Sequence, residues 1–417
     1  MTERTAFLRQ ETLSGRNKTA RTVMPEADFS HIPEPLPVRK AMAFHWICRQ
    51  MPVAIFPREL IVGTRTFLGH QVSEEDPEVD WSCPPLTVYP KYVSQEDIRR
   101  FGMDGSGVND RHYTPDLGLL LEKGIGGICR EAELRKRDSA LRPDQTAFLD
   151  ALIIAWSGMS ELIRRYADLA AALSREAQTA DEAERLEQIR RVCENIAQGR
   201  PTCFREAVQL LWFGHLGTIL ESGIFINYGR LDVILAPYLQ NLPRDEARQL
   251  LECLLLKMYD QADILDKSYF KRHEGQLVVT LGGLLPNGES AISEVTLLFL
   301  DAIGATRLPE PEFNLRISSL DPPEYLEKAS RLTATGCNFI SYYNDDQIVR
   351  SLTEAGLSPE DARSYGFDLC QDITLPGKAD FFCLYSTSLA HDLMALLEEE
   401  DSFPDFSSLM SRFRVIY

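Results

Sequence analysis

The sequence lacks several features that place a protein in a familiar class. Nowhere do 18 uncharged apolar residues run together, and the stretch MTERTAFLRQETLSGRNKT has no apolar core like that of a signal peptide. Positive charge is also scarce, because 44 Lys and Arg residues stand against 62 Asp and Glu residues, a net charge of −18. A nucleic acid would meet general repulsion from such a chain. These absences predict a cytoplasmic protein that has neither a membrane nor a nucleic acid as a partner.

Paired cysteines are missing as well. The nine cysteines are scattered, with no C-x-x-C pair and no even framework, so a disulfide scaffold is not predicted. This spacing is typical of reduced thiols in a reducing compartment. Cysteine and histidine pairs at zinc-ligand spacing are absent too, and no metal site is predicted.

What the sequence contains is the composition of a folded protein. Apolar residues make up 44% and charged residues 25% of 417 positions, enough for one large domain or for two or three ordinary ones. Residues 65–118, rich in Pro, Gly, Asp and Ser, are predicted to be irregular with brief helix. Elsewhere in the first half, apolar periodicity predicts helices at 37–51, two long amphipathic ones between 140 and 198, an interior one at 203–222 and another at 247–267.

The pattern changes after residue 275. Short apolar stretches predict strands at 275–285, 313–318, 338–345 and 366–372, with helices between them at 291–304, 323–335, 346–355 and 359–365. This alternation predicts parallel β/α packing in residues 275–417, beside a mainly helical part in residues 1–260. In such structures functional groups lie where strands end in loops, and Cys370 and Asn344 fall at such ends.

Cys370 has two interpretations on its residues alone. A lone cysteine is most often a buried structural residue. Its place between YGFDL and the turn-forming QDITLPGK instead favours chemistry at the mouth of a strand. Asp372 could exchange a proton beside the sulfur, or bond its own turn backbone. None of the seven histidines identifies itself as the partner that a thiolate hydrolase needs.

Other polar residues have plainer explanations. Lys257 and Lys267 stand among acidic residues, so solvated helix faces account for them. His215 lies in an apolar helix, where a satisfied core histidine is commoner than a ligand. The glycines of LGG and NYG lack the spacing of a phosphate-binding loop.

Several sequence blocks, taken together, resemble one known family. The strongest is YNDDQIVRSLTEAGLSPEDARSYGFDLC, residues 343–370, in which N-D, A-G, E-D-A-x-x-Y and the cysteine follow at family spacing. PVRKAMAFHWICRQMPVAIFPRELIVG, NYGRLDVILAPYL and PEPEFNLRIS are similar to further blocks in the same order. The chain thereby resembles the glycyl radical enzymes, also called the pyruvate formate-lyase-like family.

The resemblance implies an α/β fold in which a helix-rich N-terminal part surrounds half of a ten-stranded β/α barrel. It implies that Cys370 is the thiyl residue, which takes a hydrogen atom from the substrate in a dry cavity. Asp372 stands where family members often carry a glutamate that acts as acid or base. In the family, a radical S-adenosylmethionine activating enzyme places the radical on a backbone glycine near the C-terminus. The chain itself is expected to bind no cofactor.

The sequence differs from the family pattern in two ways that change the activity expected of this chain. Leu369 precedes Cys370 where pyruvate formate-lyase has a second cysteine, so acyl transfer between two sulfurs is not expected. The sequence ends in SRFRVIY without the family's R-V-x-G-Y motif. Residues 1–417 are therefore expected to be an incomplete domain, inactive alone, with the cysteine loop at 365–378 and the glycyl radical on a missing C-terminal segment. A separately encoded half could supply it, and the complete enzyme is expected to be a homo-oligomer.

The function implied by the resemblance is radical cleavage of a C–X bond in a small polar substrate, as in a dehydratase, decarboxylase or lyase. The alternative is a catalytically inactive fragment or scaffold. Strand-end position nominates Phe339, Tyr343, Asn344 and Asp345 as substrate-binding residues. Asn344 and Asp345 have a second interpretation as caps of the following helix.

Overall fold

The computed structural model describes most of the chain, which divides by its internal contacts into two units, residues 1–381 and 382–417. The described residues are 1–14, 27–64, 90–94, 96–97, 112–220, 225–262, 277–337, 339–368, 372–378, 393, 396–397 and 402–416. In the second unit the longest described element is helix α15 (Phe406–Ile416).

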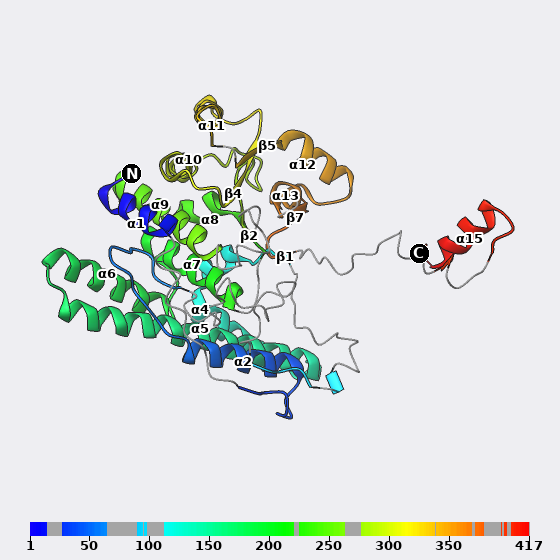
Figure 1. Ribbon diagram of the computed structural model, residues 1–417, viewed down its shortest axis with the longest axis horizontal. Coiled ribbons are helices and arrows are strands. Elements are labelled where there is room, and N and C mark those ends of the chain that lie inside the picture. Colours follow the sequence, from blue (N-terminus) through cyan, green and yellow to red (C-terminus); the bar gives the residue numbers. More distant parts are fainter. Residues whose placement is uncertain are drawn as a thin grey trace. The chain divides into compact units, whose positions relative to one another are not determined.

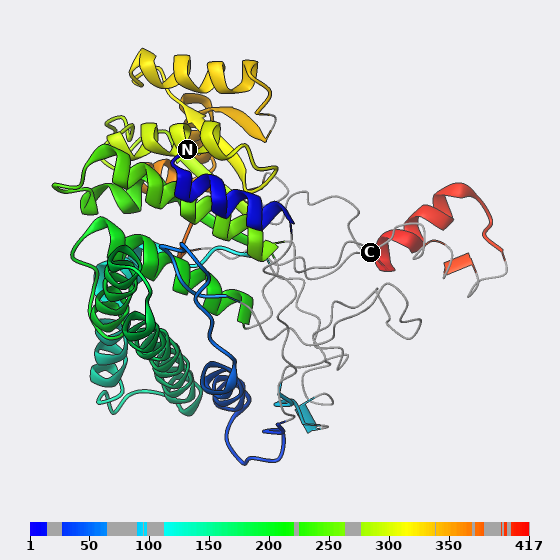
Figure 2. The same ribbon diagram turned by 60° about the vertical axis from the view of Figure 1, so that its left-hand side comes forward.

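Helices dominate the part of the first unit that precedes residue 263. They are α1 (Glu3–Ser14), α2 (Leu36–Gln50), α4 (Leu117–Arg135), α5 (Pro143–Glu176), α6 (Ala180–Ile196), α7 (Phe204–Leu220), α8 (Leu231–Leu235), the 3-10 turn η3 (Ala236–Tyr238) and α9 (Arg244–Ala262). Helix α5 packs against both α2 and α6 (Figure 2). The two long helices predicted between 140 and 198 are thus confirmed, and Thr179 caps α6 by accepting a hydrogen bond from the Glu182 amide.

Helix α7 lies in the interior, as its sequence predicts. Phe204, Trp212 and most of its other side chains are buried, because apolar residues occupy nearly its whole circumference. His215 is fully buried there, and its ring stacks on that of Tyr228 with 4.8 Å between centroids.

Helix α5 is the one helix among the described residues that is long and apolar enough to cross a membrane, judged by length and composition alone. Of its most apolar window, 44% is buried inside the protein. It packs against α2 and α6, which cover part of its apolar surface.

Five strands form one parallel sheet in the order β1-β2-β3-β4-β5 (Figure 1). They are β1 (His112–Tyr113), β2 (Phe225–Arg230), β3 (Leu277–Gly282), β4 (Glu312–Ile317) and β5 (Ile340–Asn344), with α10 (Glu294–Thr306) and α11 (Pro323–Ala334) in the later crossovers. Every residue of β3 is buried, as expected of a strand in a parallel sheet. The fold is therefore an α/β fold with a parallel half-sheet, as the sequence analysis predicted.

The structure differs from the prediction in the origin of the strands. Strands β1 and β2 come from before residue 260, so the helical part and the sheet are not successive regions. The described residues of the predicted strand 366–372 do not join the parallel sheet either: β6 (Gly366–Phe367) pairs antiparallel with β7 (Ile373–Thr374), after helices α12 (Asp345–Glu354) and α13 (Pro359–Arg363). Strands of two residues carry no alternation from which sequence could identify them.

Lys257 corrects another expectation, because it is not on a solvated helix face. Its side chain is 5% exposed and forms an ion pair with Glu59, whose side chain is 6% exposed. Glu59 also accepts a hydrogen bond from the Phe56 amide at 2.9 Å. Burial raises the pKa of Glu59, although the Lys257 ammonium beside it acts in the opposite direction. Lys267 lies outside the described residues.

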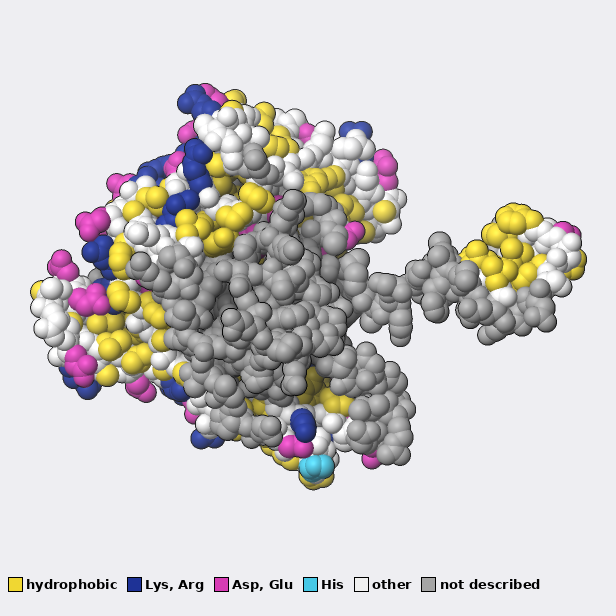
Figure 3. All heavy atoms as spheres, in the orientation of Figure 1, with side chains coloured by type: hydrophobic (Ala, Val, Ile, Leu, Met, Phe, Trp, Pro, Cys, Tyr) yellow, Lys and Arg dark blue, Asp and Glu magenta, His cyan; other side chains and the backbone are white. Residues whose placement is uncertain are grey.

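Charges of both signs share the described surface. Figure 3 shows Asp and Glu side chains interspersed with Lys and Arg on the face in view. Several of them pair along α6, where Arg190 binds Glu187 and Glu194. The acidic excess of the chain is thus distributed rather than gathered in one described segment.

Candidate active site

The two faces of the central sheet carry different side chains. On β4, Phe313 and Leu315 join the apolar core with α10, while Asn314 and Arg316 alternate onto the opposite face. The register places Thr280 of β3 beside Asn314 on that face. All three polar residues are fully buried. A buried polar face at the centre of a sheet favours a functional role, because a purely structural core would be apolar.

The hairpin of β6 and β7 lies on this polar face. The Phe367 amide donates to the Thr280 hydroxyl at 3.1 Å, and the Asn227 side-chain amide donates to Asp368 at 2.6 Å. Across the hairpin, the Asp368 amide donates to the Asp372 carbonyl oxygen at 2.8 Å. The chain before Cys370 is thereby attached to the sheet, and the chain after it is paired with that attached segment, while Cys370 itself lies outside the described residues.

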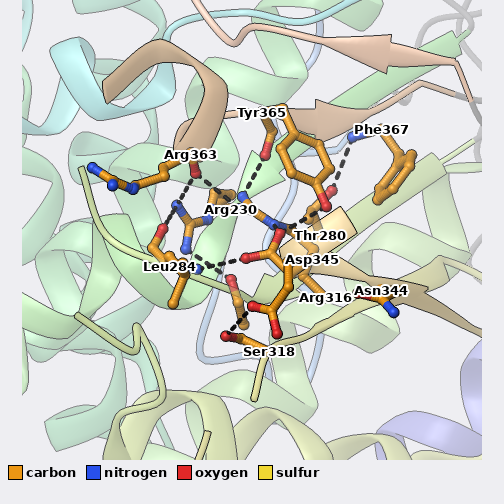
Figure 4. Close-up of polar contacts among 12 residues, drawn as sticks. Arg230, Thr280, Leu284, Arg316, Ser318, Asn344, Asp345, Arg363, Tyr365 and Phe367 are labelled. Carbon is orange, nitrogen blue, oxygen red and sulfur yellow. Dashed lines mark hydrogen bonds and ion pairs between the residues drawn. The ribbon is translucent and has the colours of Figure 1, made fainter. Parts of the chain in front are cut away.

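Arg316 binds the segment that leads into this hairpin (Figure 4). Its guanidinium donates to the carbonyl oxygens of Tyr365 at 2.7 Å and Arg363 at 2.9 Å, and its Nε donates to Asp345 at 2.7 Å. The Tyr365 hydroxyl donates to the same carboxylate at 2.8 Å, and the ring of Tyr365 lies 3.8 Å from the guanidinium carbon. Burial raises the pKa of Tyr365, which keeps its phenol protonated as this donor.

Arg230, at the end of β2, reaches the same place from another strand. It donates to the carbonyl oxygens of Leu284 at 2.7 Å, Gly282 at 2.7 Å and Arg363 at 3.0 Å. Burial, and then repulsion by the neighbouring Arg316, lower the pKa of Arg230 to about 10. The guanidinium remains charged at neutral pH, since this value lies well above 7.

The glycine pair after β3 makes room for Arg316. Gly283 has a φ of +79°, a conformation that residues with a Cβ rarely adopt. A Cβ at this position would overlap the Nε of Arg316. The LGG stretch therefore serves the close approach of an arginine rather than a phosphate.

We expect Gly283→Ala to lower the free energy of unfolding by about 2–4 kcal/mol, from backbone strain and the overlap with Arg316 together. Urea denaturation followed by circular dichroism measures the change. Gly356→Ala is the matched control, because Gly356 has a φ of +105° and nothing within 4 Å of an added Cβ. That control should cost about 1–2 kcal/mol from the backbone alone. Equal losses in the two variants would contradict the assigned overlap.

The structure places the predicted substrate-binding residues in different surroundings. Asp345 is fully buried, and both of its oxygens are engaged, one by Arg316 and Tyr365 and the other by the Leu284 amide at 3.0 Å. This geometry favours a structural role over substrate binding. Asn344 caps α12 by accepting from the Gln347 amide at 3.1 Å.

Tyr343 and Asn344 come together at an open hollow of about 560 Å³ beyond the carboxyl ends of β4 and β5, whose other lining residues include Ser318, Ser319 and Tyr342. Asp345 and Phe339 are not among its lining residues, and the ring of Tyr343 also packs on that of Phe367.

Asp372 is exposed on the hairpin. Within the described ranges, no three His, Cys, Asp or Glu side chains gather at metal-binding distance.

Sequence reasoning missed the two arginines and Asn227. For Arg316 a signal existed, because F-N-L-R-I places a charged residue inside an otherwise apolar strand. An arginine there must be buried, and a buried arginine needs partners. For Asn227 and Asp368 no local pattern existed, since the two residues are 141 positions apart in the chain.

The fold has close counterparts among solved structures. The glycerol dehydratase of Clostridium butyricum, described as B12-independent, superposes with a TM-score of 0.75 over 99% of this chain and 62% of its own, at 24% identity. A glycyl radical enzyme from Archaeoglobus fulgidus superposes with a TM-score of 0.72 over 97% of this chain and 62% of its own, at 22% identity. The class defined by the fold is thus that of the glycyl radical enzyme barrels.

Sequence comparison carries the identification further. Residues 91–401 match the family model described as pyruvate formate lyase-like, and the chain belongs to this family. Trans-4-hydroxy-L-proline dehydratase of Clostridioides difficile is 30% identical over 281 residues, 62% of this chain and 35% of that protein. "Probable dehydratase YbiW" of Escherichia coli is 26% identical over 88% of this chain and 53% of its own length. The chain thus spans between a third and about half of these two relatives.

Proposed function

We propose that this chain is the cysteine-bearing part of a glycyl radical enzyme that cleaves a C–X bond in a small polar substrate, as a dehydratase, decarboxylase or lyase. One observation carries the proposal: the hairpin that bears Cys370 is attached to the buried polar face of a five-stranded parallel sheet. Relatives named as dehydratases and sulfite-lyases support this reaction type. Their substrates suggest the class of molecule, not its identity.

In the proposed reaction Cys370 transfers hydrogen atoms. Its sulfur, as a thiyl, takes a hydrogen atom from a substrate carbon, which leaves an S–H bond and a carbon radical. Asp372 takes the proton of the neighbouring hydroxyl and gives it to the leaving group as the C–X bond breaks, so its carboxylate ends the turnover in its starting state. The product radical then recovers the hydrogen atom from Cys370, which regenerates the thiyl. A hydrogen-atom transfer needs no thiolate, so no histidine beside the cysteine is required.

The glycyl radical supplies the thiyl, and we place it on a further C-terminal segment with the family's glycine motif. A radical S-adenosylmethionine activating enzyme is the proposed partner that installs it. We further propose a homo-oligomer in the cytoplasm. The scattered spacing of the nine cysteines, without a C-x-x-C pair, supports a reducing compartment.

The test is electron paramagnetic resonance of the assembled protein. The chain is co-expressed under strict anoxia with a glycine-bearing C-terminal segment and an activating enzyme, and a glycine-centred doublet is expected. A sample without the activating enzyme is the control. Absence of the doublet, with the two protein segments shown to be folded and bound to each other, would leave the chain as a catalytically inactive scaffold.

A further inference from the structure

Two buried arginines converge on one carbonyl oxygen in this protein. Arg316 and Arg230 both donate to the carbonyl of Arg363, at 2.9 and 3.0 Å (Figure 4). Arg316 is fully buried and Arg230 is 7% exposed. We call these two guanidinium groups, with the carbonyl groups that they bind, the arginine clamp.

Such an arrangement is a poor way to stabilise a fold. Two like charges lie side by side in the interior, and the repulsion from Arg316 contributes to the lowered pKa of Arg230. Burying an ion pair such as Arg316 with Asp345 is often no more stabilising than well-packed apolar residues of the same volume. Stabilisation of the fold therefore does not explain why two arginines are buried in the clamp.

The geometry of the clamp supplies that explanation. A guanidinium is a planar fork whose donors have fixed directions, so it sets both the distance and the orientation of the groups it binds. Arg316 is anchored in β4 and Arg230 at the end of β2. The carbonyls of Arg363 and Tyr365, just before β6, are thereby held relative to two strands of the sheet.

The hairpin of β6 and β7 depends on contacts with other parts of the protein to hold its position. Its strands β6 and β7 have two residues each, and a two-stranded hairpin is at best marginally stable in water. Its place is therefore decided by contacts with the sheet. The clamp holds its entrance, while Thr280 and Asn227 bind Phe367 and Asp368.

We propose that Arg316, together with Arg230, is a positioning residue that sets where the cysteine-bearing hairpin lies over the sheet. The consequence for catalysis rests on the proposed function, whereas the position of the hairpin can be measured without it. Asp345 orients Arg316, because its carboxylate is itself held by Tyr365 and the Leu284 amide.

The first test uses Arg316→Lys in the full chain. Lysine keeps the positive charge beside Asp345 but cannot bind both carbonyls as a planar fork. Hydrogen exchange of the Phe367 and Asp368 amides is expected to accelerate at least tenfold. The rate at which N-ethylmaleimide alkylates Cys370, measured by peptide mass spectrometry, is expected to change by a similar factor. Alkylation of the exposed Cys203 provides the internal reference.

Two further variants separate positioning from stability. Lys257→Met is expected to destabilise the chain through Glu59, which belongs to neither the clamp nor the hairpin, and so reports the effect of stability alone. The double variant Arg316→Met, Asp345→Leu removes both charges and is expected to stay folded. Its hairpin amides should nevertheless exchange at least tenfold faster than those of the unaltered chain. The proposal would be overturned if the double variant had the amide exchange and Cys370 labelling rates of the unaltered chain. It would also be overturned if Lys257→Met changed these rates as much as Arg316→Lys does.

In the assembled enzyme, Arg316→Lys is expected to lower kcat about 10- to 100-fold, because small displacements of a reacting group have effects of this size. KM and the amplitude of the glycyl signal should stay within about twofold. An unchanged kcat would refute the role in catalysis. If the unaltered enzyme forms no radical, the proposed function fails, while the exchange and labelling results still decide the role of the clamp.

Discussion

Replacing Cys370 by alanine is expected to abolish turnover in the assembled enzyme and to leave the glycine-centred radical signal intact. The sulfur is the hydrogen-atom carrier in the proposed reaction, and alanine has no weak bond to hydrogen with which to replace it. Cys370→Ser should be equally inactive, because an O–H bond is much stronger than an S–H bond. Turnover is followed by product formation over a panel of small polar alcohols, amino acids and sulfonates.

Cys203→Ala is the matched control, because Cys203 is an exposed thiol just before α7. We expect its turnover and its radical signal to equal those of the unaltered enzyme. Residual turnover in Cys370→Ala above the level without activating enzyme would refute the thiyl assignment. Loss of the radical signal in the same variant would instead show that Cys370 is needed for assembly or activation.

Lys257→Met is expected to lower the free energy of unfolding by about 3–5 kcal/mol, the usual result of leaving one member of a buried ion pair without its partner. The stranded group is Glu59, whose side chain is 6% exposed. Glu59 keeps its hydrogen bond from the Phe56 amide but loses its counter-ion. Urea denaturation of the full chain, followed by circular dichroism, measures the loss.

The free energy of unfolding that is lost in Lys257→Met should increase as the pH rises. Burial raises the pKa of Glu59 above its usual 4.5, and removal of Lys257 raises it further. Between 4.5 and the raised value, the folded state holds a proton that the unfolded state has released, so stability falls as the pH rises. The variant should therefore be closer to the unaltered chain at pH 5 than at pH 8.

Lys328→Met is the matched control for this prediction. Lys328 also pairs with a carboxylate, that of Asp301, but the two side chains are 24% and 29% exposed. A partly exposed pair of this kind contributes about 1 kcal/mol or less. If Lys257→Met cost no more than Lys328→Met at pH 8, the Glu59–Lys257 pair would not be a buried pair in solution.

Lys257 shows why local sequence was insufficient at some positions. Acidic neighbours along the chain suggested a solvated helix face, yet its partner is Glu59, 198 positions away. Strands β1 and β2 were missed for a related reason. Strand β1 has only two residues, and β2 has a short alternation of Ile226 and Tyr228 with Asn227 and Gly229; both are fixed by pairing with neighbouring strands of the sheet.

The sequence by itself determined the helical framework and the buried strands β3 and β4, because apolar periodicity reports directly which face of an element is removed from water. The spacing of residues 343–370 also indicated the family, and it predicts a cysteine loop at 365–378. Tertiary structure alone decided that Asp345 binds Arg316 and that two arginines from different strands meet at the entrance of the hairpin. Those contacts join residues between 29 and 133 positions apart, and such distances are set by how strands lie in the sheet, which no local pattern of side chains records.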